Sequence, residues 1–219
     1  MGVIKYQKKE NMAFEILPNG VKRAEMLPGM VEGVHTYKCQ VKAGETVELE
    51  VFGDITQLIY ITSGECYITT RDKAFMVTEP SLFIPNMDLE KNVLHAVTDV
   101  EYLQLTCEML PMDKEWWGKW HISLPRFCPL SQCIQYTEGF RPEGIKAYSI
   151  LDTHWITRMT MGAIIGKGPN KADPHRHEDL YQWYYGMPGT KFIYRAGDEE
   201  MELSEGDFAF IPINIDHAI

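Results

Sequence analysis

The chain contains, near its C-terminal end, the stretch Gly168-Pro-Asn-Lys-Ala-Asp-Pro-His175-Arg-His177-Glu-Asp-Leu-Tyr-Gln182-Trp-Tyr-Tyr-Gly-Met-Pro-Gly189. Two histidines stand two residues apart, and a side-chain amide follows five residues later. Residues i and i+2 of a β-strand point to the same face, so a strand here would direct His175 and His177 toward one point. The stretch therefore predicts two converging imidazoles with the Gln182 amide nearby.

A second stretch downstream supplies a third histidine. It reads Gly206-Asp-Phe-Ala-Phe-Ile-Pro212-Ile-Asn214-Ile-Asp-His217. Neutral imidazole is a good ligand for Mn, Fe, Co, Ni, Cu and Zn, and a site with few protein ligands keeps positions open for water or substrate. We therefore predict one divalent transition metal held by His175, His177, Gln182 and His217. The alternative is that Gln182 hydrogen-bonds a neighbour and the three histidines bind the metal alone.

Together the two stretches resemble the paired motifs of the cupin superfamily, whose members have the RmlC-like jelly-roll fold. The first motif places a carboxylate where this chain has Gln182. The second motif is matched by Gly206, Pro212 and His217, with Asn214 in place of a glycine. Asparagine is the ordinary residue that best replaces glycine in a left-handed turn, so this departure is mild. The resemblance implies an all-β fold built from jelly-roll β-barrels.

An internal repeat predicts two such barrels in the chain. Gln182 and Gly189 align with Gln57 and Gly64, and Ala209-Phe-Ile-Pro-Ile aligns with Leu82-Phe-Ile-Pro-Asn. The first half also shows short alternating or apolar segments at the spacing of a sandwich or jelly roll, at residues 36–41, 47–51, 57–64, 66–70, 82–85 and 100–107. The chain thus resembles a bicupin.

The N-terminal copy lacks the histidines. Glu50, Phe52 and Glu90 align with the three histidine positions. Glu50, Gln57 and Glu90 could offer oxygen atoms to a hard cation, and His95 lies close by in sequence. The ring of Phe52, however, would occupy a ligand position. We therefore expect one metal per chain, in the C-terminal barrel, and a packing or dimerisation role for the N-terminal one.

These assignments set the expected segment boundaries. We expect an N-terminal arm over residues 1–33, a degenerate cupin barrel over 34–110, an aromatic-rich inter-barrel linker over 111–150 and a metal-binding barrel over 151–219. Trp116, Trp117 and Trp120 in the linker would fill the seam between the barrels or form a wall for ligand stacking. The second barrel lacks the strand expected after His217. Either the chain is truncated, or another segment such as the arm covers that edge.

The bulk composition narrows the classes of partner. The 219 residues carry a net charge of −10, which argues against binding to nucleic acid or to anionic membranes. We find neither a signal peptide nor an apolar run of membrane-spanning length, and we expect a cytoplasmic protein. The five scattered cysteines are expected to be free thiols. We also expect a homodimer.

The ligand set predicts the chemistry of the substrate. Without a carboxylate ligand the metal keeps its full 2+ charge, which favours anionic ligands. We expect a small oxygenated anion, such as a sugar acid or keto acid that chelates through two oxygens. Alternation along a strand puts Tyr184 on the face of Gln182, which makes it the candidate catalytic acid or base. Asp216, beside His217, either orients an imidazole or faces solvent.

Two classes of function remain open. The first is a metal-dependent enzyme, either of the isomerase or lyase type or a dioxygenase, all of which the cupin resemblance allows. The second is a binding or sensor protein that holds a sugar or metabolite without turnover. Because a fold does not determine a reaction, the resemblance does not choose between them.

Overall fold

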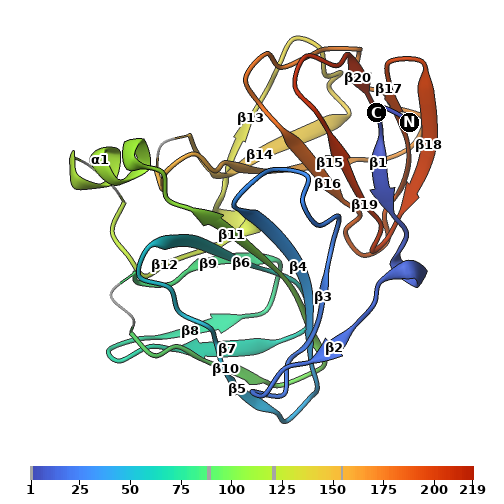
Figure 1. The fold of residues 1–219 in the computed structure, drawn as a ribbon. Helices are drawn as coiled ribbons and strands as arrows, with labels where there is room; N and C mark the ends of the chain where they lie inside the picture. Colours follow the sequence, from blue (N-terminus) through green and yellow to red (C-terminus); the bar gives the residue numbers. More distant parts are fainter. Residues whose placement is uncertain (1, 88–89, 120–121, 154) are drawn as a thin grey trace. The chain divides into compact units, whose positions relative to one another are not determined.

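The computed structural model describes residues 2–87, 90–119, 122–153 and 155–219. The chain forms two compact units (Figure 1). The N-terminal unit consists of Ala13–Ile134 and Ser149–Gly162, and the C-terminal unit consists of Met1–Met12, Gln135–Tyr148 and Ala163–Ile219. The units therefore differ from the predicted segments, because the arm and the linker each contribute to both.

The N-terminal unit is built from two antiparallel sheets. One has the strand order β12-β9-β6-β11-β4-β3-β2 and the other has the order β5-β10-β7-β8. The strands are β2 (Glu15–Ile16), β3 (Lys22–Glu25), β4 (Val34–Val41), β5 (Thr46–Glu48), β6 (Ile55–Ser63), β7 (Cys66–Thr69), β8 (Ala74–Val77), β9 (Ser81–Ile84), β10 (Val93–Ala96), β11 (Val100–Glu108) and β12 (Arg126–Pro129). The strands β4, β5, β6, β7, β9 and β11 correspond to the segments predicted from the sequence, and the prediction of an all-β fold is confirmed.

The two sheets share one apolar core. Ile59, Phe83 and Tyr102 from the first sheet pack with Ile68 and Leu94 from the second. Each of these side chains is at most 5% exposed. Burial of such side chains is worth about 1.5–3 kcal/mol each, so the apolar face of every strand holds its sheet against the other.

Gly64 ends β6 at a place where no side chain fits. Its φ is +93°, and a Cβ atom added there would lie 2.2 Å from the carbonyl oxygen of Asp99. Both the left-handed backbone and the close approach require glycine. The glycine that the repeat aligns with Gly189 is therefore needed here for packing.

The C-terminal unit also contains two sheets around one core. Their orders are β1-β19-β16 and β18-β17-β20. A further sheet, with the order β13-β14-β15, contributes residues 135–136, 145–148 and 163–166 to this unit. The strands are β1 (Lys5–Gln7), β13 (Ile134–Tyr136), β14 (Ile145–Leu151), β15 (Met161–Gly166), β16 (Gln182–Tyr185), β17 (Lys191–Ala196), β18 (Glu199–Ser204), β19 (Phe208–Ile211) and β20 (His217–Ala218). Tyr194, Leu203 and Ile211 form the centre of this core.

The first residues of the chain complete this unit. β1 pairs antiparallel with β19, with Lys5 opposite Phe210 and Gln7 opposite Phe208, as the blue strand of Figure 1 shows. Ile4 packs into the core and is 7% exposed. A strand of the arm therefore covers this edge of β19 and satisfies its backbone groups.

Helical structure is sparse. The described residues form α1 (Pro111–Lys119) and the short 3-10 turns η1 (Lys9–Asn11) and η2 (Leu130–Gln132). None of these helices has the length and apolar character that a membrane span requires. α1 carries Trp116 and Trp117, whereas Trp120 lies outside the described residues. All five cysteines are free, as predicted.

A buried carboxylate anchors the arm. Asp207 is 3% exposed and accepts hydrogen bonds from Lys8 Nζ at 2.8 Å, from the backbone N–H of Lys9 at 3.1 Å and from that of Ser204 at 2.8 Å. Burial alone would raise the pKa of Asp207, but these donors hold it below its usual range. The arm is thus tied to the C-terminal unit by a charged group that stays ionised.

Replacing Asp207 by asparagine should lower the free energy of unfolding by about 1–3 kcal/mol at neutral pH, because charge-assisted hydrogen bonds are lost. The pKa of Asp207 is lower in the folded state, so its contribution is complete above its ordinary pKa of about 4 and is lost as the pH falls further. Urea unfolding of wild type and Asp207→Asn at pH 7 and pH 3 measures this. A stability difference that is the same at both pH values would contradict it.

Candidate metal centre

The two histidine stretches are joined through their backbones. The N–H of His175 donates to the carbonyl of His217 at 3.0 Å, and the N–H of His217 donates back to the carbonyl of His175 at 2.9 Å. This isolated bridge is the one regular pairing between residues 167 and 181, all of which are described. The expected strand under His175 and His177 is therefore wrong, and an extended segment takes its place. One bridge suffices to set two of the histidines opposite each other.

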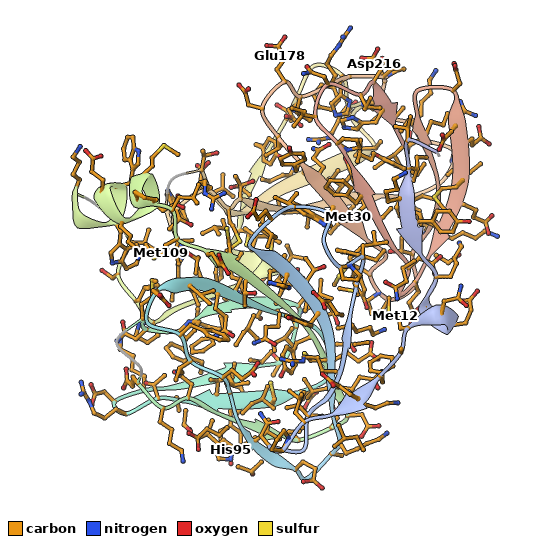
Figure 2. The ribbon with its side chains drawn as sticks, viewed as in Figure 1. Met12, Met30, His95, Met109, Glu178 and Asp216 are labelled. Carbon is orange, nitrogen blue, oxygen red and sulfur yellow. The ribbon has the colours of Figure 1, made fainter. Side chains whose placement is uncertain are left out.

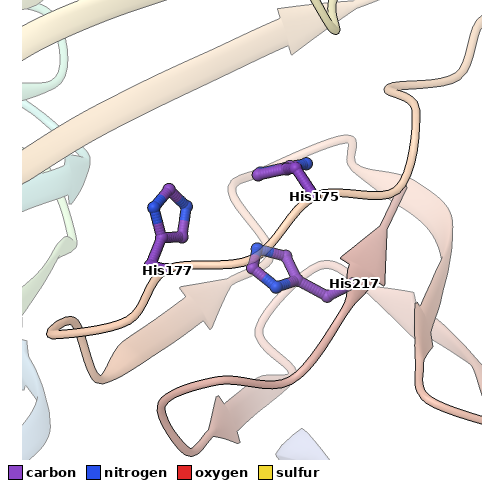
Figure 3. A group of neighbouring side chains, drawn as sticks. All are labelled: His175, His177 and His217. Atoms are coloured by element: carbon purple, nitrogen blue, oxygen red, sulfur yellow. The ribbon is translucent and has the colours of Figure 1, made fainter.

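The three imidazoles lie side by side, as Figure 3 shows. One ring nitrogen from each of His175, His177 and His217 lies within 4.8 Å of the others. The ring centroids of His175 and His217 are 4.5 Å apart, and that of His177 lies 5.2 and 5.4 Å from them. The nitrogens are close enough for a single ion to lie between them.

Backbone carbonyls fix which nitrogen of two rings is free. Nδ1 of His175 lies 3.0 Å from the carbonyl oxygen of Asp173, and Nδ1 of His217 lies 2.9 Å from that of Ile215. A carbonyl oxygen can only accept, so each Nδ1 carries the proton and each Nε2 keeps its lone pair. Nε2 of His217 is buried without a hydrogen-bond partner. A metal ion would supply that partner, so the residues present fit one.

The surroundings favour the neutral form of two of the imidazoles, those of His217 and His177. Burial lowers the pKa of His217, and the neighbouring His175 and His177 lower it further, against the raising effect of the Ile215 carbonyl. Burial also lowers the pKa of His177, with smaller effects from His175 and Arg141. Only a deprotonated imidazole nitrogen can ligate a metal, so the site is ready for metal at neutral pH.

Asn214 shapes the turn that leads to His217. Its φ is +61°, in the left-handed region, as the asparagine-for-glycine replacement predicted. Its backbone N–H donates to the carbonyl of His177 at 2.9 Å. The turn therefore adds a further backbone hydrogen bond between the two histidine stretches. This bond is at His177, whose ring is not bonded to a backbone carbonyl as the other two rings are.

Gln182 and Tyr184 begin β16 on the same face. The Tyr184 hydroxyl lies 3.5 Å from Oε1 of Gln182, and the Tyr184 ring lies 6.4 Å from that of His217. Trp183 packs instead against Phe210, with centroids 5.1 Å apart. Burial raises the pKa of Tyr184 to about 12, against the lowering effects of Tyr194 and Arg141. The hydroxyl thus keeps its proton at neutral pH and can donate it.

The acidic residues near the histidines in sequence point elsewhere. Glu178 and Asp216 lie at the outer surface of the C-terminal unit (Figure 2), and Asp179 is also exposed. Asp216 pairs with Arg176 at 3.1 Å, and the His217 ring takes the Ile215 carbonyl as its partner. Of the two alternatives for Asp216, the structure shows the solvent-facing one.

Sequence reasoning missed two residues beside the site. The ring of Phe140 stacks on His175, with centroids 3.8 Å apart and planes 21° apart. Arg141 follows it, and its guanidinium lies 4.8 Å from the centre of the Phe140 ring. The segment around them is expected as a linker and has no periodic pattern, so nothing in the sequence pointed to these residues.

The aligned region of the N-terminal unit is filled by its own side chains. Arg23 Nη1 donates to the Glu50 carboxylate at 2.9 Å, and Gln104 Nε2 donates to Glu50 at 3.1 Å and to Oε1 of Gln57 at 2.7 Å. Glu90 instead accepts from the backbone N–H of Arg71 at 2.9 Å. The guanidinium thus neutralises the carboxylate that a cation would need. This supports the prediction of a metal-free N-terminal barrel, which remains a prediction.

Comparison with known proteins identifies the fold. Residues 163–219 match the family model described as the cupin domain. A Pseudomonas aeruginosa protein named as glyoxylate-induced is 12% identical with a TM-score of 0.81, covering 100% of this chain and 84% of that one. A mutant of Bacillus subtilis oxalate decarboxylase is 13% identical with a TM-score of 0.70, covering 97% and 72%. The Ylba protein of E. coli is 12% identical with a TM-score of 0.66, covering 99% and 86%.

No curated protein matches the sequence. At these identities the solved structures establish the fold alone, and they do so along the whole chain. The family match covers the histidine motifs of the C-terminal unit. Residues 163–219 thus match the cupin domain, and the solved structures share their fold with the whole chain.

Proposed function

We propose that the chain is a bicupin that binds one divalent transition metal in its C-terminal unit, through His175, His177 and His217. Gln182 is the candidate fourth ligand. The observation that carries this proposal is the buried, partnerless Nε2 of His217, which lies in a group of three ring nitrogens within 4.8 Å of one another. Mn, Fe, Co, Ni, Cu and Zn all suit such ligands. The N-terminal unit then serves packing and, we expect, homodimer formation.

The proposed ligand set favours anions. When bound, the metal would act as a Lewis acid toward oxygen atoms and would lower the pKa of bound water. Three imidazoles and an amide leave its 2+ charge uncompensated, so a substrate carboxylate would be attracted. The names of two fold relatives refer to glyoxylate and oxalate, which are small carboxylates. We propose a sugar acid or keto acid as the ligand class.

Tyr184 is the candidate acid in a reaction on such a molecule. Its hydroxyl is held near Gln182 and keeps its proton, since burial raises the pKa to about 12. A protonated hydroxyl can donate to an oxygen that becomes negative during isomerisation or elimination. We therefore favour isomerase or lyase chemistry, with O2-dependent oxidation as the other enzymatic possibility.

A non-catalytic binding or sensor function is the alternative. It is favoured by the position of the acidic residues Glu178, Asp179 and Asp216, which are exposed and leave the site without a carboxylate base from these neighbours. Turnover of sugar acids or keto acids by the metal-loaded protein would exclude it. Tight binding of such an acid with no product formed would favour it.

Replacing His177 by alanine should reduce bound metal from one ion per chain to nearly none, because two histidines hold a divalent metal poorly. Elemental analysis of the purified protein measures this, and circular dichroism checks that the variant is folded. His95→Ala is the matched control, since this ring stacks on Tyr67 in the N-terminal unit, and it should keep the metal. Unchanged metal in His177→Ala would refute the ligand set, and two ions per wild-type chain would refute the metal-free N-terminal barrel.

If Gln182 is a ligand, Gln182→Ala should weaken metal binding by about 10-fold or more. A loss of that size is typical even when the residue removed only hydrogen-bonds a metal ligand. Gln182→Glu should strengthen metal binding, because a carboxylate neutralises part of the charge, and should weaken the binding of anions. Competition titrations with a chelator measure both affinities. Equal metal affinity in all three proteins would show that the histidines bind alone.

A further inference from the structure

The segment that precedes the cupin domain contributes a wall to the imidazole cluster. Within the C-terminal unit, the Phe140 ring stacks on His175 at 3.8 Å. The Phe140 carbonyl accepts a hydrogen bond from the backbone N–H of Asp173 at 2.9 Å, which ties the two segments together. Whatever binds among the histidines therefore lies beside residues of this segment.

Arg141 places a buried cation in the same wall. Its side chain is 10% exposed, and its guanidinium carbon lies 4.8 Å from the centre of the Phe140 ring and 5.7 Å from that of Tyr136. Nη1 donates to the Glu138 carboxylate. Nε is buried and has no hydrogen-bond partner. One part of the guanidinium is thus paired, while an adjacent N–H is left without an acceptor.

The geometry brings Arg141 next to the proposed site. Its guanidinium lies 4.8 Å from the centre of the Phe140 ring, and that ring stacks on His175 at 3.8 Å. A buried guanidinium N–H without an acceptor is unfavourable, and a carboxylate is its best partner because the two planar groups can pair through parallel hydrogen bonds.

We propose that Arg141 binds the carboxylate of the small anionic ligand that the metal site takes, and that it selects acids over neutral analogues. This inference rests on the proposed function and specifies its substrate class. Glu138 competes for the guanidinium and holds it in place when no ligand is bound. Arg141 thus determines which ligands the site accepts.

Arg176 offers a matched control. It lies between two of the histidines in sequence, but its side chain is 57% exposed and pairs with Asp216 at 3.1 Å. Removing it deletes the same charge from the same unit without touching the wall. The Arg176→Met variant should therefore keep both metal and ligand binding.

The test uses the full chain reconstituted with Mn²⁺, with pyruvate and its neutral methyl ester as probes. Calorimetric titration measures their Kd, and elemental analysis of the same samples measures metal. Arg141→Met should weaken pyruvate binding by about 10- to 100-fold, with metal content unchanged, and should abolish the preference for pyruvate over the ester. Arg141→Lys should lose less, because it keeps the charge but not the planar fork. Glu138→Gln should bind pyruvate more tightly, which a purely structural role for Arg141 would not produce.

The inference is overturned if Arg141→Met binds pyruvate within about twofold of wild type, or if Arg141→Met and Arg176→Met weaken binding equally. With one metal per chain in these samples, either result leaves the metal site standing and removes only the role of Arg141. A wild-type protein that takes up no metal would overturn both proposals.

Discussion

The reciprocal pair of backbone hydrogen bonds between His175 and His217 is the constraint on which the site depends. It joins two stretches of chain and sets their side chains next to each other. Each of these rings then donates its Nδ1 proton to a carbonyl two residues earlier, which leaves Nε2 free. The Asn214 turn adds the tie to His177. Because the backbone supplies these contacts, the rings of His175 and His217 are positioned without a metal, which would lower the cost of ordering two of the proposed ligands.

The two units deal with buried polar groups in different ways. In the N-terminal unit, the Glu50 carboxylate is paired with Arg23, and the Gln57 amide is paired with Gln104, although Nε of Arg23 is buried without a partner. In the C-terminal unit, burial lowers the pKa of His217, and its Nε2 has no partner within the protein. A buried polar atom without a partner is costly unless something else completes it. The aligned regions therefore differ in chemistry, with a carboxylate paired to a guanidinium in one unit and an unpartnered imidazole nitrogen in the other.

The arm and the segment before the cupin domain show that the C-terminal unit is assembled from separated parts of the chain. β1 covers the edge of β19, and Asp207 anchors the residues that follow β1. Phe140 and Arg141 reach the imidazole cluster from another segment. Edge coverage removes a site for unwanted strand pairing, and in the proposed function the aromatic and cationic wall would let the site recognise anions.

The sequence by itself determined the features that depend on local chemistry. Side-chain period predicts the alternating strands, and ligand chemistry picks out the three histidines that come together. Backbone sterics account for glycine at Gly64 and for the left-handed Asn214, and all of these effects act within a few residues. Only the tertiary structure decided how the strand edge is covered, that an extended segment with a single bridge carries His175 and His177, and that Arg141 stands beside them. These features arise from contacts between distant segments, for which no spacing or periodicity exists along the chain.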